Sequence, residues 1–288
     1  MNKMSIRFFN DREVRAVWDD ENSKWWFSVI DIVAVLSESE DARNYWYVLK
    51  NRLKKENSQL LTICKGLKLK APDGKMRLTD VLDSEGVIAL AKNFPNNRAV
   101  KFLDWFTYSD NTIDGQSKKK AYTLFESDLL KSLDAGTVKC LQQIHAYLFG
   151  GLYDFAGQIR TKNISKGGFT FAPCQYFDVT LNTIERMPET TFDEIIDKYV
   201  EMNVAHPFME GNGRSARIWL DLMLKRSLKL CVDWSKINKN DYLNAMRKSL
   251  TNSENIKLLI KNALTDKIDD REMFMKGIDY SYYYEENE

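Results

Sequence analysis

HPFMEGNGRSAR, the stretch from His206 to Arg217, decides the fold of the second half of this 288-residue sequence. A helix is predicted before it, because Thr191 and Glu194 have capping-box spacing and apolar residues recur at helical intervals over residues 192–200. The proline after His206 disfavours helical backbone at the histidine, so the chain must turn there. Dense apolar residues over 216–230 predict a buried helix directly after the stretch.

The turn between these two helices predicts an anion site. Gly211 and Gly213 flank Asn212 and permit positive backbone dihedrals, so that successive N–H groups can point at one spot. Such a nest at a helix N-terminus binds phosphate. Arg214 and Arg217 lie three positions apart in the first turn, so two guanidinium groups can reach the same anion.

Two further side chains beside this nest suggest catalysis. His206 is placed to act as a general base, and Glu210 supplies one carboxylate for a hard cation such as Mg²⁺. The other histidine, His145, adjoins the apolar face of a predicted helix, where a structural role is favoured. Two histidines and four scattered cysteines disfavour a histidine-rich or cysteine-rich metal centre. The phosphate nest, the base and the carboxylate together predict nucleotidyl or phosphoryl transfer. The sequence contains no GxxxxGK[ST] motif, so a P-loop enzyme is disfavoured.

Composition is that of an ordinary soluble protein, with 44% hydrophobic and 29% charged residues and a net charge of +1. No apolar run reaches the roughly 18 residues of a membrane span, and no secretory signal is evident at the start. A cytoplasmic protein with no membrane partner is therefore expected. The length suggests two domains, and the polar run over residues 108–120 predicts a linker between domains at 1–112 and 121–288.

The first domain is predicted to be α+β and the second mainly α-helical. Short apolar runs and turn residues over 6–27 indicate a β meander, and the LKLKA-PDGK-MRLTDVL pattern indicates a later hairpin. Trp46, Leu49 and Leu53 share one face of a predicted helix. The exception to helix in the second domain is NISKGGFTFAP, residues 163–173, which predicts a β-hairpin.

The stretch from His206 to Arg217 also resembles the complete HPFx[DE]GNGRxxR signature of the Fic family, and residues 153–169 resemble that family's approach to its flap hairpin. The resemblance covers residues 121–288 and implies a protein adenylyltransferase that moves AMP from ATP to a Tyr, Ser or Thr hydroxyl of a target protein, or of the chain itself. It implies that His206 is the base and that Phe208 anchors the loop. Glu210 would hold Mg²⁺, and the ATP phosphates would be bound by Gly211, Asn212, Gly213, Arg214 and Arg217.

The resemblance extends to the flap and to the end of the chain. The flap would pair with an extended segment of the target by strand addition, through Lys166, Gly167, Gly168, Phe169, Thr170, Phe171 and Ala172. Residues 281–287 resemble the inhibitory motif [ST]xxxE[GN], with Ser281 and Glu285 at i, i+4 and Glu286 departing from the pattern. This implies that Glu285 pairs with Arg217, with help from Ser281, and takes the place of the γ-phosphate. Its acidic neighbours, including Asp279, should make the helix intrinsically weak.

The first domain resembles the Bro-N domain of phage-type antirepressors over about the first 110 residues, through the segments FNDREVRAVWDDENSKWWFSVIDIVAVL and LTDVLDSEGVIAL. The resemblance implies DNA binding, and nine basic residues between Lys50 and Arg77 agree with it. A solvated charged face and a docking or dimerisation module are the alternatives. Two other interpretations of the whole chain stay open: a phosphodiesterase that removes AMP from a modified protein, and a DNA-binding regulator whose second domain senses nucleotide.

Overall fold

Two compact units make up the chain, Met1–Thr112 and Ile113–Glu288. The computed structural model describes residues 3–9, 11–19, 21–22, 24–37, 39–71, 73–108, 111–166 and 168–285.

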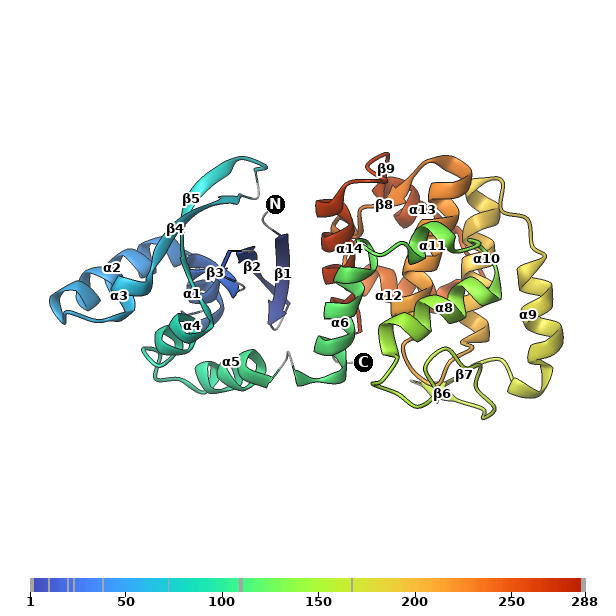
Figure 1. Ribbon diagram of the computed structural model, residues 1–288, viewed down its shortest axis with the longest axis horizontal. Coiled ribbons are helices and arrows are strands. Elements are labelled where there is room, and N and C mark those ends of the chain that lie inside the picture. Colours follow the sequence, from blue (N-terminus) through green and yellow to red (C-terminus); the bar gives the residue numbers. More distant parts are fainter. Residues whose placement is uncertain are drawn as a thin grey trace. The chain divides into compact units, whose positions relative to one another are not determined.

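A five-stranded antiparallel sheet forms the centre of the first unit, with the strand order β1-β2-β3-β5-β4 (Figure 1). Ile6 pairs with Arg15 and Val17 with Trp26, which confirms the predicted meander. Lys65 pairs with Val81, which confirms the predicted hairpin. The strands are β1 (Lys3–Phe9), β2 (Arg12–Asp19), β3 (Lys24–Ser28), β4 (Lys65–Lys70) and β5 (Met76–Leu82).

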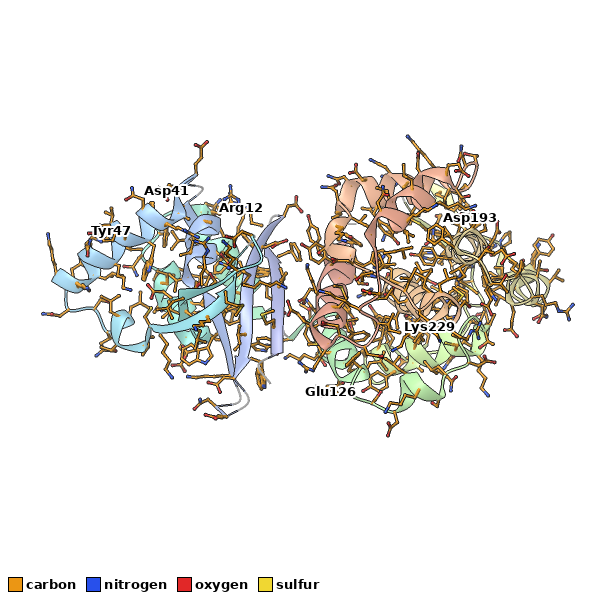
Figure 2. The ribbon with its side chains drawn as sticks, turned by 90° about the horizontal axis from the view of Figure 1, so that it is seen from above. Arg12, Asp41, Tyr47, Glu126, Asp193 and Lys229 are labelled. Carbon is orange, nitrogen blue, oxygen red and sulfur yellow. The ribbon has the colours of Figure 1, made fainter. Side chains whose placement is uncertain are left out.

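The helices of the first unit bury apolar faces against this sheet. Trp46, Leu49 and Leu53 of α2 are buried, as their spacing predicts, whereas Tyr47 on the opposite side is exposed (Figure 2). Asp41 caps α2 by accepting a hydrogen bond from the Asn44 amide. The helices are α1 (Val29–Ser37), α2 (Ala42–Lys55), α3 (Leu60–Ile63), α4 (Ser84–Ala91) and α5 (Asn97–Tyr108).

The second unit is mainly helical, as the sequence predicts, and α11 passes through its core. Trp219, Leu220 and Leu224 of α11 are completely buried, and α11 packs against both α8 and α10 (Figure 1). The helices are α6 (Ile113–Leu124), α7 (Leu129–Ser132), α8 (Val138–Phe149), α9 (Phe177–Glu185), α10 (Phe192–Ala205), α11 (Asn212–Leu228), α12 (Lys239–Lys248), α13 (Glu254–Ala263) and α14 (Arg271–Tyr283). Two short strand pairs complete it: β6 (Ser165–Lys166) with β7 (Phe169–Thr170), and β8 (Cys231–Val232) with β9 (Leu264–Thr265).

The predicted linker is wrong over much of its length. Residues 113–124 form α6, which packs against α8 and α14 within the second unit. The polar composition of this segment suggests a linker because only a narrow set of positions, among them Ser117, Ala121 and Leu124, is buried. A helix that covers one side of a core can carry charges over the rest of its surface.

Among the described residues, no helix has both the length and the apolar character needed to cross a membrane.

Candidate active site

His206 stands at the C-terminal end of α10, where the sequence places it. Thr191 and Glu194 form the predicted capping box at the start of this helix. The helix ends because His206 adopts a left-handed conformation, with φ 49° and ψ 64°, while its amide still donates to the Met202 carbonyl. Such backbone is uncommon for a residue with a Cβ, so the surrounding structure must hold it in place.

The imidazole of His206 is oriented by two contacts. Nδ1 lies 3.3 Å from the Asn203 carbonyl oxygen, which can only accept, so Nδ1 carries the proton and Nε2 keeps its lone pair. The ring stacks on Phe171 with centroids 3.7 Å apart. Burial lowers the pKa of His206 to about 4, so the ring is neutral at physiological pH. A neutral imidazole with a free Nε2 can accept a proton.

The N-terminus of α11 follows at once and is built on two glycines. Gly211 has φ 80°, and a Cβ there would collide with the Phe149 ring. The Asn212 side chain accepts from the Phe208 amide at 2.9 Å and donates to the Phe208 carbonyl at 2.8 Å. The Asn212 side chain therefore stabilises the turn. Its polar atoms are used in these bonds, so Asn212 can bind an anion through its backbone amide. Phe208 is completely buried and anchors the loop, as predicted.

Glu210 and Arg214 form an ion pair at the edge of this turn, with Arg214 NH2 2.8 Å from Glu210 Oε1. Half of the Glu210 side chain is exposed, so its carboxylate can reach a cation at the mouth of the site. One carboxylate beside a phosphate nest fits Mg²⁺, which prefers few protein oxygens together with substrate phosphates. No cluster of three or more His, Cys, Asp or Glu side chains suited to a metal occurs among the described residues.

The predicted pair between Glu285 and Arg217 is present. Arg217 donates to the Glu285 carboxylate, and this carboxylate lies against Gly213, where a Cβ would collide with it. Burial opposes the charge on each side chain, yet the pair raises the pKa of Arg217 and lowers the pKa of Glu285. The carboxylate therefore occupies the N-terminal turn of α11, where an anion would bind.

The role expected of Ser281 needs a correction. Ser281 is hydrogen-bonded to Arg217 rather than to the Glu285 carboxylate: its hydroxyl accepts from Arg217 Nε at 2.8 Å, and its carbonyl accepts from Arg217 Nη2 at 2.7 Å. It orients the guanidinium instead. Glu285 lies just beyond the end of α14, and its amide donates to the Tyr282 carbonyl. Glu286, where the motif departs from its pattern, lies outside the described residues.

Residues 279–285 are more firmly packed than their composition predicts. Asp279 is buried and paired with Lys118 of α6 at 2.8 Å, so a cation offsets its charge. The Tyr284 hydroxyl donates to the carbonyls of Trp234 and Ile237 at 2.8 and 2.9 Å. Asp279, expected to be unfavourable near the end of the helix, thus fastens α14 to its neighbour.

The predicted hairpin is formed by β6 and β7, with Lys166 opposite Phe169. Gly168 turns the chain with φ 80°, and Gly167 lies outside the described residues. Ser165, Lys166 and Thr170 are exposed, and Phe169 packs edge-on against Phe171. Phe171 stacks on His206, so the base of the flap helps to fix the histidine.

Arg160 is a site residue that the sequence did not reveal. Its buried guanidinium donates to the carbonyls of Lys162, Ala172, Ala205 and His206, at 2.6 to 3.1 Å. It thereby ties both ends of the flap to the loop that presents His206. An arginine after an apolar run has no spacing signal that would distinguish it from a surface residue.

Asp114 is a second unforeseen residue, because it falls within the predicted linker. Asp114 lies in the first turn of α6, and its carboxylate forms an ion pair with Arg214 Nη1 of α11. An aspartate in a polar run carries no signal that separates an active-site acid from a solvated one.

The structural role predicted for His145 is confirmed. This completely buried side chain accepts from the Gly157 amide at 2.8 Å, lies 2.8 Å from the Glu210 carbonyl oxygen, and stacks on Phe208. It holds the loop between α10 and α11 through Phe208 and the Glu210 carbonyl.

Comparisons with known proteins agree with this geometry. A profile of the Fic/DOC family matches residues 136–224, and a profile of the BRO family N-terminal domain matches residues 13–113. Protein adenylyltransferase VbhT of Bartonella schoenbuchensis is 29% identical over 140 residues, which cover 44% of this chain and 29% of VbhT. A probable protein adenylyltransferase of Sinorhizobium fredii, y4lH, is 28% identical over 142 residues, 44% of this chain and 73% of that protein. The chain thus spans less than a third of VbhT.

Among solved structures, the Bartonella tribocorum effector BepC, crystallised with AMPPNP, aligns with a TM-score of 0.46 and 19% identity. The alignment covers 53% of this chain and 84% of BepC. The two family profiles, the intact HPFMEGNGRSAR stretch and the helix–loop–helix that carries it lead to one conclusion: the chain contains a domain of the Fic/DOC family at residues 136–224, preceded by a BRO-family N-terminal domain at residues 13–113.

Proposed function

We propose that this protein is a Mg²⁺-dependent protein adenylyltransferase that transfers AMP from ATP to a Tyr, Ser or Thr hydroxyl of a target protein or of its own chain. One observation carries the proposal: His206, whose ring is neutral at physiological pH, ends α10 five positions before Gly211, the N-cap of the helix that carries Arg214 and Arg217. The names of the adenylyltransferase relatives support the same reaction. With ATP as the donor, the proposed place of action is the cytoplasm.

The reaction follows from the positions of the groups. The amides of Gly211, Asn212 and Gly213, at the positive end of the α11 dipole, would bind the phosphate chain. Arg214 and Arg217 would add charge-assisted hydrogen bonds. His206 Nε2 would take the proton of the target hydroxyl while that oxygen attacks the α-phosphorus. The new O–Pα bond forms as the Pα–O bond to the β-phosphate breaks, and pyrophosphate carries the electron pair away.

The flap would fix the target hydroxyl. We propose that an extended target segment pairs with the flap, Lys166 to Ala172, in which Lys166, Gly168 and Thr170 are exposed, through main-chain hydrogen bonds that depend little on target sequence. Since Phe171 of the same hairpin stacks on His206, a segment bound there would lie next to the base.

Glu210 would hold Mg²⁺, which neutralises charge on the phosphates when bound. Glu210→Ala should lower AMP transfer at least about tenfold and weaken the dependence on Mg²⁺, because a single protein carboxylate is proposed to hold the cation. Initial rates over a Mg²⁺ titration test this. Glu201→Ala, on the exposed surface of α10, is the control. Unchanged Mg²⁺ dependence in Glu210→Ala, or full activity in excess chelator, would contradict the assignment.

We further propose that Glu285 inhibits the enzyme in the free state. Its carboxylate lies on Arg217 and against Gly213, so the γ-phosphate and Glu285 would need the same space. Hydrolytic removal of AMP is the alternative: Glu285 could activate a water that attacks the α-phosphorus of a modified protein and releases AMP and the protein hydroxyl, with His206 still required. Incubation with an AMP-modified target separates the two, since hydrolysis releases AMP without consuming pyrophosphate.

A second function, DNA binding by the first unit, is favoured by the basic β4–β5 hairpin. Lys65, Lys68 and Lys75 are exposed on it. Each DNA phosphate that the protein neutralises contributes about −0.9 to the slope of log K against log[salt], where K is the DNA-binding constant. We expect a slope steeper than about −3 for the wild type. Replacing Lys68 and Lys75 by Ala should make this slope less steep by roughly one to two. Fluorescence anisotropy with duplex DNA measures it. A shallower slope or no binding would favour the docking or dimerisation role.

Intact-mass spectrometry tests the main proposal. The full chain and a host lysate would be incubated with ATP and Mg²⁺, and a mass gain equal to AMP on any protein supports adenylyl transfer. Gains equal to a phosphate group alone would show a kinase reaction instead.

A further inference from the structure

Arg214 is almost completely enclosed by the protein itself. Its side chain is 3% exposed, and its guanidinium lies between the rings of Phe149 and Tyr282, 5.0 and 5.6 Å from their centroids. Two carboxylates share it: Asp114 pairs with NH1 and Glu210 with NH2. Burial would lower the pKa of Arg214, but these carboxylates and Glu285 raise it. Both terminal nitrogens that a phosphate would use are thus already paired with an internal acid.

Asp114 differs from the other two acids in its origin and its exposure. It lies in the first turn of α6, where the helix dipole favours a negative charge, and 62% of its side chain is exposed. A pair with one exposed partner contributes little to stability. Arg214 Nη1 carries two N–H donors, and a phosphate that approaches the one turned toward Asp114 competes with this carboxylate.

α6 is also fastened to α14, the helix that leads to Glu285. Ser117 accepts a hydrogen bond from the Tyr282 hydroxyl at 2.9 Å, and Lys118 pairs with Asp279 at 2.8 Å. Tyr282, in turn, covers Arg214. α6 and α14 therefore meet over the same guanidinium, and a shift of α6 would disturb both.

We propose that Asp114 is a second internal competitor for the nucleotide phosphates, acting on Arg214 as Glu285 acts on Arg217. This inference rests on the proposed function of the site, and it adds a control point on a different element. α6 begins at Ile113, the first residue of the second unit, so Asp114 lies near the start of this unit whereas Glu285 lies near its end. Two acids then compete with the ATP phosphates: Asp114, from the first helix of the second unit, and Glu285, which follows its last helix.

The test is equilibrium binding of MgATP, AMPPNP and adenosine to the full chain by calorimetry. Asp114→Asn keeps the shape and removes the charge, so it should tighten MgATP and AMPPNP binding by about threefold, within the range of a partly exposed ion pair, and leave adenosine unchanged. The gain should appear in the wild type and also in a Glu285→Gly background, because that substitution leaves both Asp114 and Arg214 in the chain. Asp114→Glu should stay close to wild type. Asp128→Asn, a highly exposed charge in the same unit, is the matched control.

Two results would overturn the proposal. Unchanged MgATP affinity in Asp114→Asn would show that Asp114 does not compete, and weaker affinity would show that it positions Arg214 for the nucleotide. Equal melting temperatures of Asp114→Asn and Asp114→Glu exclude a folding defect as the cause. Binding needs no turnover, so failure to detect AMP transfer would count against the proposed function and leave this result intact.

Discussion

In His206→Ala, AMP transfer should fall by about 10²–10⁴-fold, the usual contribution of a positioned general base. Nucleotide binding should persist, because the amides and arginines of the phosphate site belong to the turn and helix that follow the histidine. Single-turnover AMP transfer, with calorimetry of MgATP on the same samples, measures both. The background should be Glu285→Gly, so that the parent rate is high enough to show a large loss.

The orientation of the imidazole gives this prediction a second measurable consequence. Since Nδ1 faces the Asn203 carbonyl oxygen, Nε2 is the nitrogen that accepts the proton. The pKa of His206 is about 4 and only the neutral ring is a base, so kcat/KM should stay level from neutral pH down to about 5 and fall as the pH approaches 4. Near-normal turnover in His206→Ala would remove the histidine from the mechanism.

In Glu285→Gly, AMP transfer to the chain itself or to a target should rise at least about tenfold, which corresponds to about 1.4 kcal/mol of released inhibition. The substitution removes the carboxylate from Arg217 and from the surface of Gly213. Ser281 still orients the guanidinium in this variant, so the arginine remains in place for the nucleotide. Initial rates at several ATP concentrations measure the effect.

Two variants separate inhibition from general loosening of the C-terminal segment. Glu285→Gln keeps the length of the side chain without its charge and should release only part of the inhibition. Arg217→Ala removes the partner of Glu285 but also a phosphate ligand, so it should not mimic Glu285→Gly. Equal rates for Glu285→Gly and wild type at saturating ATP would show that the terminal segment does not inhibit.

The parts of the fold that the sequence predicts well are those in which local rules and packing agree. The capping box at Thr191, the proline after His206 and the glycine at 211 each act over a few residues, so short-range patterns alone predict the helix–loop–helix of the site. The meander and the β4–β5 hairpin follow in the same way from alternation and turn residues.

The misses concern contacts between residues far apart in the chain. Asp114 lies 100 positions before Arg214, and Arg160 lies 46 before His206, so no local pattern joins them. α6 has the composition of a linker because charged residues cover most of its surface, although its few apolar positions are buried. The inhibitory motif correctly predicts that Ser281, Glu285 and Arg217 lie together. It does not predict which atom Ser281 contacts, because that depends on how α14 packs on Arg217.

We propose that the site transfers the α-phosphoryl group of ATP together with its adenosine. The most direct measurement compares Glu285→Gly incubated with a lysate, Mg²⁺ and ATP labelled either at the α-phosphate or at the γ-phosphate. Label should enter protein from α-labelled ATP only, and His206→Ala should abolish it. Label entering protein from γ-labelled ATP, or equal incorporation in His206→Ala, would contradict adenylyl transfer by this site.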